Sequence, residues 1–165
     1  MILVRHSERA DDPSMPYEIK MKQDDIIIEY DPQLSRPTGK TQAVLTAQYI
    51  KQKLTQIEYG IDLENAEIFL FSSPFLTCLE SSTAIAKEIK IKSISVQDQL
   101  SDILMKNWYP EDPFLGLTTK LTNNKEKFTQ FLKNQYDVPE LTIEYKRSTN
   151  LVTYPETVDS TSKRY

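Results

Sequence analysis

Residues 1–11 read Met1-Ile2-Leu3-Val4-Arg5-His6-Ser7-Glu8-Arg9-Ala10-Asp11, and His6 is the only histidine among the 165 residues. The four apolar residues at the start predict a short buried strand over 1–4. Arg5 and His6 end this run, and Arg9 follows three residues later. Imidazole can attack a phosphoryl group, and arginine binds phosphate oxygens with paired hydrogen bonds. The order therefore suggests a nucleophilic imidazole between two phosphate-binding guanidiniums.

Composition narrows the classes of function. The formal net charge is −4 and no long block of like charge is present, so neither nucleic acid nor an acidic membrane is the expected partner. No segment approaches the roughly 20 apolar residues of a membrane span, and the charged start does not resemble a signal peptide. Cys78 is the only cysteine. This excludes an internal disulfide and predicts an intracellular, reducing compartment, cytoplasmic or cytoskeletal, with an organelle left open.

Metal and cofactor sites are not expected. One cysteine and one histidine cannot supply the standard nitrogen and sulfur ligands of zinc. The only glycines, Gly39, Gly60 and Gly116, cannot form a glycine-rich phosphate loop or a dinucleotide-binding fingerprint.

Strand and helix patterns alternate along the chain. Apolar residues at helical spacing predict helices from Thr38 toward Gly60, from Ser73-Pro74 to about Ile89, and at 124–134, with a weaker signal at 100–106. Further strands are predicted at 67–72, 93–97 and 141–145, and the irregular segment 10–37 holds a short extended piece at 26–28. This alternation predicts one α/β domain over 1–165 with a largely parallel sheet.

Two predicted strand ends carry the polar residues of interest. In open α/β sheets, ligands bind beyond the carboxyl ends of the strands. Arg5 and His6 follow the first strand, and Ser72-Ser73-Pro74 follows the second, so we expect them to face one crevice. The simpler alternative is that Arg5 and Arg9 are surface residues and His6 is a hydrogen-bonded histidine at a strand end.

The chain resembles the histidine phosphatase superfamily, which has the phosphoglycerate mutase-like fold, at five places in the same order. The first segment is similar to R-H-G-E-R-x-D, the form found in TULA-type phosphatases. The others are similar to D-x-P-L-T…G…Q-A, S-S-P-x-x-R-C-x-Q-T, L-x-E and F-P-E-S…R. The matching segments are Leu3–Asp11; Asp31–Ser35 with Gly39 and Gln42-Ala43; Ser72–Ser81; Leu100–Asp102; and Tyr154–Thr157 with Arg164. The resemblance implies a three-layer α/β/α sandwich around a mostly parallel central sheet.

The resemblance also implies roles for individual residues. His6 would be the nucleophile, Arg5 and Arg9 the phosphate ligands, and Asp102 the proton donor. For Asp102 the alternative is a residue at a helix start on a solvated face.

Several positions depart from the family pattern. Thr77 stands where the family has another phosphate-binding arginine, and a hydroxyl brings no charge. Ser7 replaces the motif glycine, and Glu80 adds negative charge near a site meant for an anion. The second catalytic histidine would end a strand beyond Tyr165, so we expect a domain that lacks its C-terminal strand and helix. Residues 141–145 or 151–154, a borrowed strand, or a larger assembly would then complete the sheet.

Three hypotheses remain. The favoured one is a degenerate, non-catalytic histidine-phosphatase-like domain, a pseudoenzyme that acts as a structural or scaffolding component with protein partners. The second is an active phosphomonoesterase that works through phospho-His6. The third is a regulatory module that binds phosphate or a phosphorylated ligand without catalysis.

Overall fold

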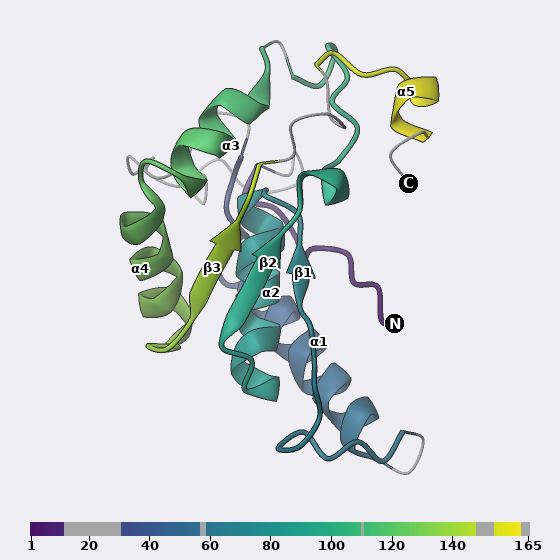
Figure 1. Cartoon of the computed structure of the whole chain (residues 1–165), viewed down its shortest axis with the longest axis vertical. Coiled ribbons are helices and arrows are strands. Elements are labelled where there is room, and N and C mark those ends of the chain that lie inside the picture. Colours follow the sequence, from purple (N-terminus) through teal and green to yellow (C-terminus); the bar gives the residue numbers. More distant parts are fainter. Residues whose placement is uncertain (12–30, 57–58, 110, 148–153, 163–165) are drawn as a thin grey trace.

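The computed structural model describes residues 1–11, 31–56, 59–109, 111–147 and 154–162. Parallel strands form one sheet in the order β1-β2-β3, which confirms the predicted α/β class (Figure 1). The strands are β1 (Phe71–Ser72), β2 (Ser93–Val96) and β3 (Thr142–Tyr145). The helices are α1 (Thr38–Thr55), α2 (Leu76–Ile89), the 3-10 helix η2 (Asp98–Leu100), α3 (Pro113–Leu121), α4 (Lys125–Tyr136) and α5 (Val158–Ser162).

The register of the strands gives the sheet two different faces. Ile94, Val96 and Ile143 lie on one face, in a core shared with α2, α3 and α4. On the other face Phe71 aligns with Ser95 of β2, which aligns with Glu144 of β3. Phe71 and Glu144 are exposed there. In the described part of the chain, the helices therefore cover one face of the sheet, and the second helical layer of a three-layer sandwich is not seen.

Helix α2 connects the sheet to α1. Its Leu76, Leu79 and Ala86 pack into the core beneath the strands, while a neighbouring face of the same helix packs on α1. In Figure 1, α2 lies behind the strands and α1 behind α2. The predicted helix over 38–60 is confirmed as far as Thr55. Gly60 has a φ of +58° and follows the helix end rather than forming it.

The predicted buried strand over 1–4 is wrong. Residues 1–4 have no strand structure, and all of them are exposed, Leu3 by 82%. Their apolar character predicts burial, but a strand also needs a neighbour to accept its backbone hydrogen bonds. A cavity separates this run from β1, the edge strand of the sheet.

Other boundaries differ from the predictions. The strand expected over 67–72 is reduced to Phe71–Ser72, and the helix expected over 100–106 is absent. There the backbone N–H and C=O of Leu104 bind Glu156 instead of helical neighbours. Helices α3 and α5 were not predicted, although Asp112 followed by Pro113 is a strong start signal and the Asp112 carboxylate does accept a hydrogen bond from the Phe114 N–H. The extended piece expected at 26–28 lies outside the described residues.

Candidate functional site

The arginine-histidine segment is held in place by the segment that contains Leu34. Arg9 and Leu34 form an isolated antiparallel bridge. The Ala10 N–H donates to the Gln33 carbonyl at 2.9 Å, and the Ser35 N–H donates to the Glu8 carbonyl at 2.9 Å. The first two sequence motifs therefore meet as a short pair of extended segments.

Gly39 is required where these segments meet α1. A Cβ at this position would overlap the carbonyl oxygen of Glu8. The Gly39 N–H donates to Ser35 Oγ at 2.8 Å, and Ser35 Oγ in turn donates to a carboxylate oxygen of Glu8 at 2.5 Å. Gln42 accepts a hydrogen bond from the Glu8 N–H at 2.9 Å. The first two motifs are thus packed against the start of α1 through Glu8, Gly39 and Gln42.

A cavity of about 880 Å³ lies between the N-terminal run and the edge of the sheet. It brings together two predicted groups, Arg5 with His6 and Ser72 with Ser73, although the run before Arg5 is not a strand. Arg9, Thr77 and Asp102 are not among its lining residues. Besides Met1–His6, the lining consists of Phe69–Ser73, Cys78, Ser81, Ser82, Ile85, Gln97, Gln99 and Leu100.

His6 is half-buried at the wall of this cavity. Its Nδ1 lies 2.8 Å from the carbonyl oxygen of Ser7, so the tautomer with a proton on Nδ1 donates this bond and leaves the lone pair on Nε2. The Ser7 N–H donates to Ser81 Oγ at 3.3 Å. The backbone N–H of Ser7 is therefore bound by a side chain of α2.

Arg9 is bound within its own motif. Its Nε and Nη2 atoms donate to the two carboxylate oxygens of Asp11 at 2.8 and 2.7 Å. The Asp11 hydrogen bond is also the main reason that the pKa of Arg9 is raised. A paired, bidentate contact of this kind is the geometry with which arginine would otherwise hold a phosphate.

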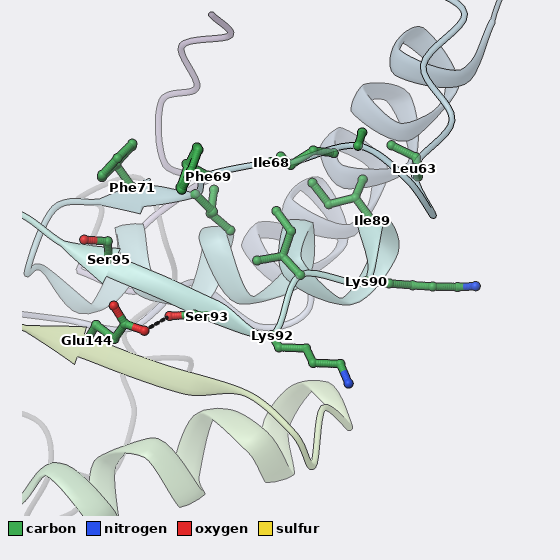
Figure 2. A pocket seen from close by; sticks show the side chains of 13 residues that line it. Leu63, Ile68, Phe69, Phe71, Ile89, Lys90, Lys92, Ser93, Ser95 and Glu144 are labelled. Atoms are coloured by element: carbon green, nitrogen blue, oxygen red, sulfur yellow. Dashed lines mark hydrogen bonds between the residues drawn. The ribbon is translucent and has the colours of Figure 1, made fainter.

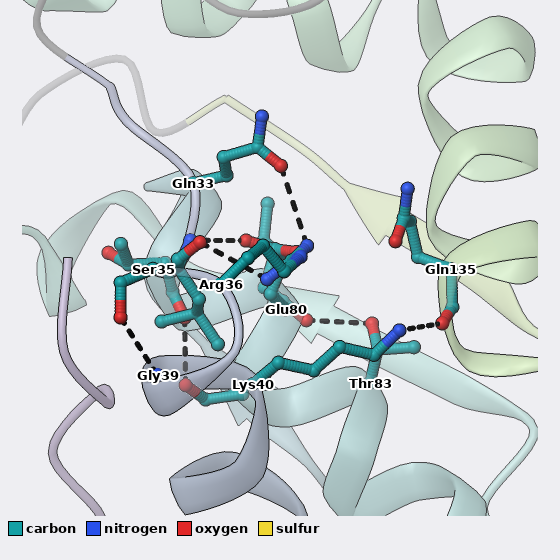
Figure 3. A network of polar contacts seen from close by, with 12 residues as sticks. Gln33, Ser35, Arg36, Gly39, Lys40, Glu80, Thr83 and Gln135 are labelled. Carbon is teal, nitrogen blue, oxygen red and sulfur yellow. Dashed lines mark hydrogen bonds and ion pairs between the residues drawn. The ribbon is translucent and has the colours of Figure 1, made fainter. Parts of the chain in front are cut away.

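Glu80 forms a buried ion pair with Arg36 (Figure 3). One carboxylate oxygen accepts from Arg36 Nη2 at 2.5 Å, and the other accepts from the Leu34 N–H at 2.6 Å. Glu80 is completely buried, and this burial outweighs both contacts and raises the pKa of its carboxyl group. The negative charge expected near the anion site is thus neutralised by Arg36, a residue that sequence reasoning missed.

A second buried ion pair joins Lys120 of α3 to Asp31. Lys120 Nζ also donates to the Pro74 carbonyl at 3.1 Å, and Asp31 accepts from the Leu76 N–H at 2.5 Å. Burial lowers the pKa of Lys120 and raises the pKa of Asp31. The pair fixes the turn that begins α2. The only signal for Lys120 in the sequence is a lone cation between the apolar residues of a short helix.

The start of α2 carries uncharged groups. Thr77 is 3% exposed, and its carbonyl accepts from Ser81 Oγ at 2.8 Å. The Ser73 hydroxyl is buried without a hydrogen-bond partner. Burial is the main cause that raises the pKa of Cys78 to about 11, which keeps the thiol protonated at neutral pH. This helix start therefore supplies no side-chain cation.

Asp102 is exposed, and its carboxylate accepts from the Ile103 N–H at 2.8 Å. The pKa of the Tyr109 phenol is raised to about 12, first by burial and then by the charge of Asp102. The 3-10 helix η2 ends at Leu100, before Asp102.

The Tyr154-Pro155-Glu156-Thr157 segment has a structural role. Glu156 accepts from the Leu104 N–H at 2.9 Å, and its own N–H donates to the Leu104 carbonyl at 2.9 Å. The Tyr154 hydroxyl donates to the carbonyl of Tyr109. Arg164 lies outside the described residues.

The described residues contain no group of three or more His, Cys, Asp or Glu side chains that could hold a metal ion. Within the same part of the chain, no helix has the length and apolar character that a membrane crossing requires. No known family model matches the sequence, and no curated protein matches it.

Proposed function

We propose that this chain is a non-catalytic, histidine-phosphatase-like domain that serves as a structural component of a larger assembly. The observation that carries the proposal is that three cations, two in or beside the motif segments and one in α3, are already bound by carboxylates. Arg9 is bound by Asp11, Arg36 by Glu80 and Lys120 by Asp31. Phosphoryl transfer depends on positive charge placed in advance around the phosphate oxygens, and these three cations are already neutralised.

Thr77 supports the same conclusion. In the family that the chain resembles, this position carries a phosphate-binding arginine, whereas here it is a buried hydroxyl at the start of α2. Removing one donor from such a site costs about 10²–10³ in rate. The Asp102 carboxylate is exposed and lies outside the cavity that His6 lines.

The exposed edge of the sheet favours a protein partner. β1 is an edge strand of the described sheet, and Phe71 within it and Phe69 just before it are exposed. We propose that a protein partner completes the sheet and the three-layer sandwich.

Phosphohistidine trapping tests the absence of catalysis. The chain is incubated with a radiolabelled activated phosphate ester beside its His6→Ala variant, with an active histidine phosphatase as the positive control. We expect no label above the background of His6→Ala. Label on the wild type that disappears in His6→Ala would refute the proposal in favour of a phosphomonoesterase.

A second candidate is phosphate binding without catalysis. Arg5 and His6 line the same cavity as the unpartnered Ser73 hydroxyl, and these groups would suit a phosphate oxygen. Calorimetry with inorganic phosphate tests this candidate. Saturable heat that disappears in Arg5→Ala supports it, and no heat at millimolar phosphate excludes it.

A further inference from the structure

Among the described residues, no strand pairs with the edge of the sheet beside the cavity. The backbone N–H of Ser95 donates to the Leu70 carbonyl, and the backbone N–H of Gln97 donates to the Ser72 carbonyl. Leu70 and Ser72 therefore direct their backbone groups toward β2. Successive residues of a strand alternate in this direction. The N–H and C=O groups of Phe69 and Phe71 therefore point toward the open edge, where they can pair with another strand.

The side chains of Phe69 and Phe71 are exposed as well. Their rings stack at a centroid distance of 6.5 Å. They line a second hollow, of about 410 Å³, on the bare face of the sheet together with Ser95 and Glu144 (Figure 2). This edge thus offers both unpaired backbone groups and aromatic surface.

We infer that the β1 edge pairs with the β1 edge of a second copy of this chain, an inference that rests on the proposed structural role and names its first partner. A two-fold axis at Leu70 sets Phe69 of each copy opposite Phe71 of the other. In this antiparallel register the two phenylalanines exchange N–H···O=C bonds across the axis. The same short strand supplies every donor and acceptor, so the contact is self-complementary and closes as a dimer.

Large apolar side chains are exposed at and near this edge. Phe69, Phe71 and the four residues of the N-terminal run are each at least 43% exposed. A standard interface takes about 800 Å² from each partner, and a fully buried aromatic side chain supplies about 150–250 Å² of it. The two phenylalanines alone supply only about a third of this area. The N-terminal run of each copy must therefore pack over the joined phenylalanines.

The charges around the cavity fit this arrangement. Arg5 is the only Lys, Arg, Asp or Glu among the residues that line it. Arg5 lines the cavity together with Ser73, and the register sets Ser73 opposite the exposed Glu67 of the second copy. The cavity lining of each copy thus holds one cation, and Glu67 of the second copy would bring a carboxylate to its edge.

Sedimentation equilibrium of the whole chain over a concentration series tests the inference. We expect the wild type to have twice the mass of one chain. Phe69→Glu with Phe71→Glu, and separately Phe69→Lys with Phe71→Lys, place like charges at the two-fold axis. Each double variant should weaken dimerisation by at least about tenfold. An equal mixture of the two should restore the dimer, because opposite charges then face each other.

Matched controls separate strand pairing from general apolar association. Leu45→Lys on α1 and Leu115→Lys on α3 alter side chains of similar exposure and should leave the dimer intact. Phe71→Pro removes one outward N–H without affecting the bonds to β2, and it should give a folded monomer by circular dichroism. A wild type that is monomeric at all concentrations overturns the inference, even where a variant fails to fold. Two double variants that stay dimeric, or a mixture that stays monomeric, also overturn it.

The test of dimerisation is independent of the test of catalysis. A monomer that takes no label on His6 refutes the dimer and leaves the non-catalytic proposal standing. A dimer that takes label on His6 refutes the non-catalytic proposal and leaves the dimer standing.

Discussion

The buried pair of Glu80 and Arg36 leads to a quantitative prediction. Replacing Arg36 by Met leaves a completely buried carboxylate without its cation, and this should cost about 3–5 kcal/mol of unfolding free energy at pH 7. Replacing Glu80 by Leu removes the charge but leaves the Leu34 N–H unpaired, at a cost of about 1–3 kcal/mol, plus the charge-assisted bond to Arg36, which contributes about 1.5–3 kcal/mol.

The double variant should cost less than the two single changes together. Once Arg36 is gone, removing Glu80 relieves a buried charge, so we expect a coupling energy of about 2 kcal/mol or more. Urea denaturation followed by circular dichroism measures all four proteins of the cycle. Lys51→Met is a matched control, because Lys51 meets Glu88 at 3.5 Å on the surface, where such pairs contribute about 0–1 kcal/mol.

The effect of pH on this cycle has a definite sign. Burial already raises the pKa of Glu80 in the folded protein, so folding favours the protonated carboxyl group. This contribution is present below the pKa of the unfolded chain and is lost as the pH rises through the folded pKa. Arg36→Met should therefore regain stability as the pH is lowered, whereas the double variant should not. Additive losses within about 0.5 kcal/mol that do not change with pH would refute this reasoning.

Three further predictions concern other buried positions and contacts of the structure. Gly39→Ala should lose at least about 1–3 kcal/mol in urea denaturation, because its methyl group overlaps the Glu8 carbonyl; an unchanged midpoint would contradict this. Alkylation of Cys78 at pH 8 should be about 100-fold slower in the folded chain than in urea, because the pKa is raised to about 11 and the thiolate is the reactive form; equal rates would exclude a raised pKa. Glu156→Ala should lose about 1–3 kcal/mol and increase hydrogen exchange at the Leu104 amide, which Glu156 binds at 2.9 Å, and an amide that stays protected would show that the bond is not needed.

The sequence predicts α1, α2, α4, β2 and β3 well. Ala43, Ala47 and Ile50 of α1 are buried as their spacing indicates, and β2 and β3 form where apolar and β-branched residues alternate. Periodicity reports which face a segment must bury. It does not report which neighbour will pair with its backbone, and this is why the apolar run over 1–4 is wrongly predicted as a strand.

The candidate site is predictable only in part. The order of strand ends predicts that Arg5, His6, Ser72 and Ser73 share a cavity, and the structure places them around one. Two of the ion pairs described above join residues far apart in sequence, Lys120 with Asp31 and Arg36 with Glu80. A sequence pattern contains no such distances. The Arg9–Asp11 pair is the exception, because two residues of spacing already suggest it.

The burial of helix α2 on two faces limits the amino-acid substitutions that this chain can tolerate. Leu76, Leu79 and Ala86 face the sheet, and Ala84, Ile85 and Ile89 face α1. Such a helix has almost no free side on which substitutions are neutral. We therefore expect a saturation library to tolerate few changes between Leu76 and Ile89 and many along the outer face of α1, so the recognisable core of any diverged descendant would be α2.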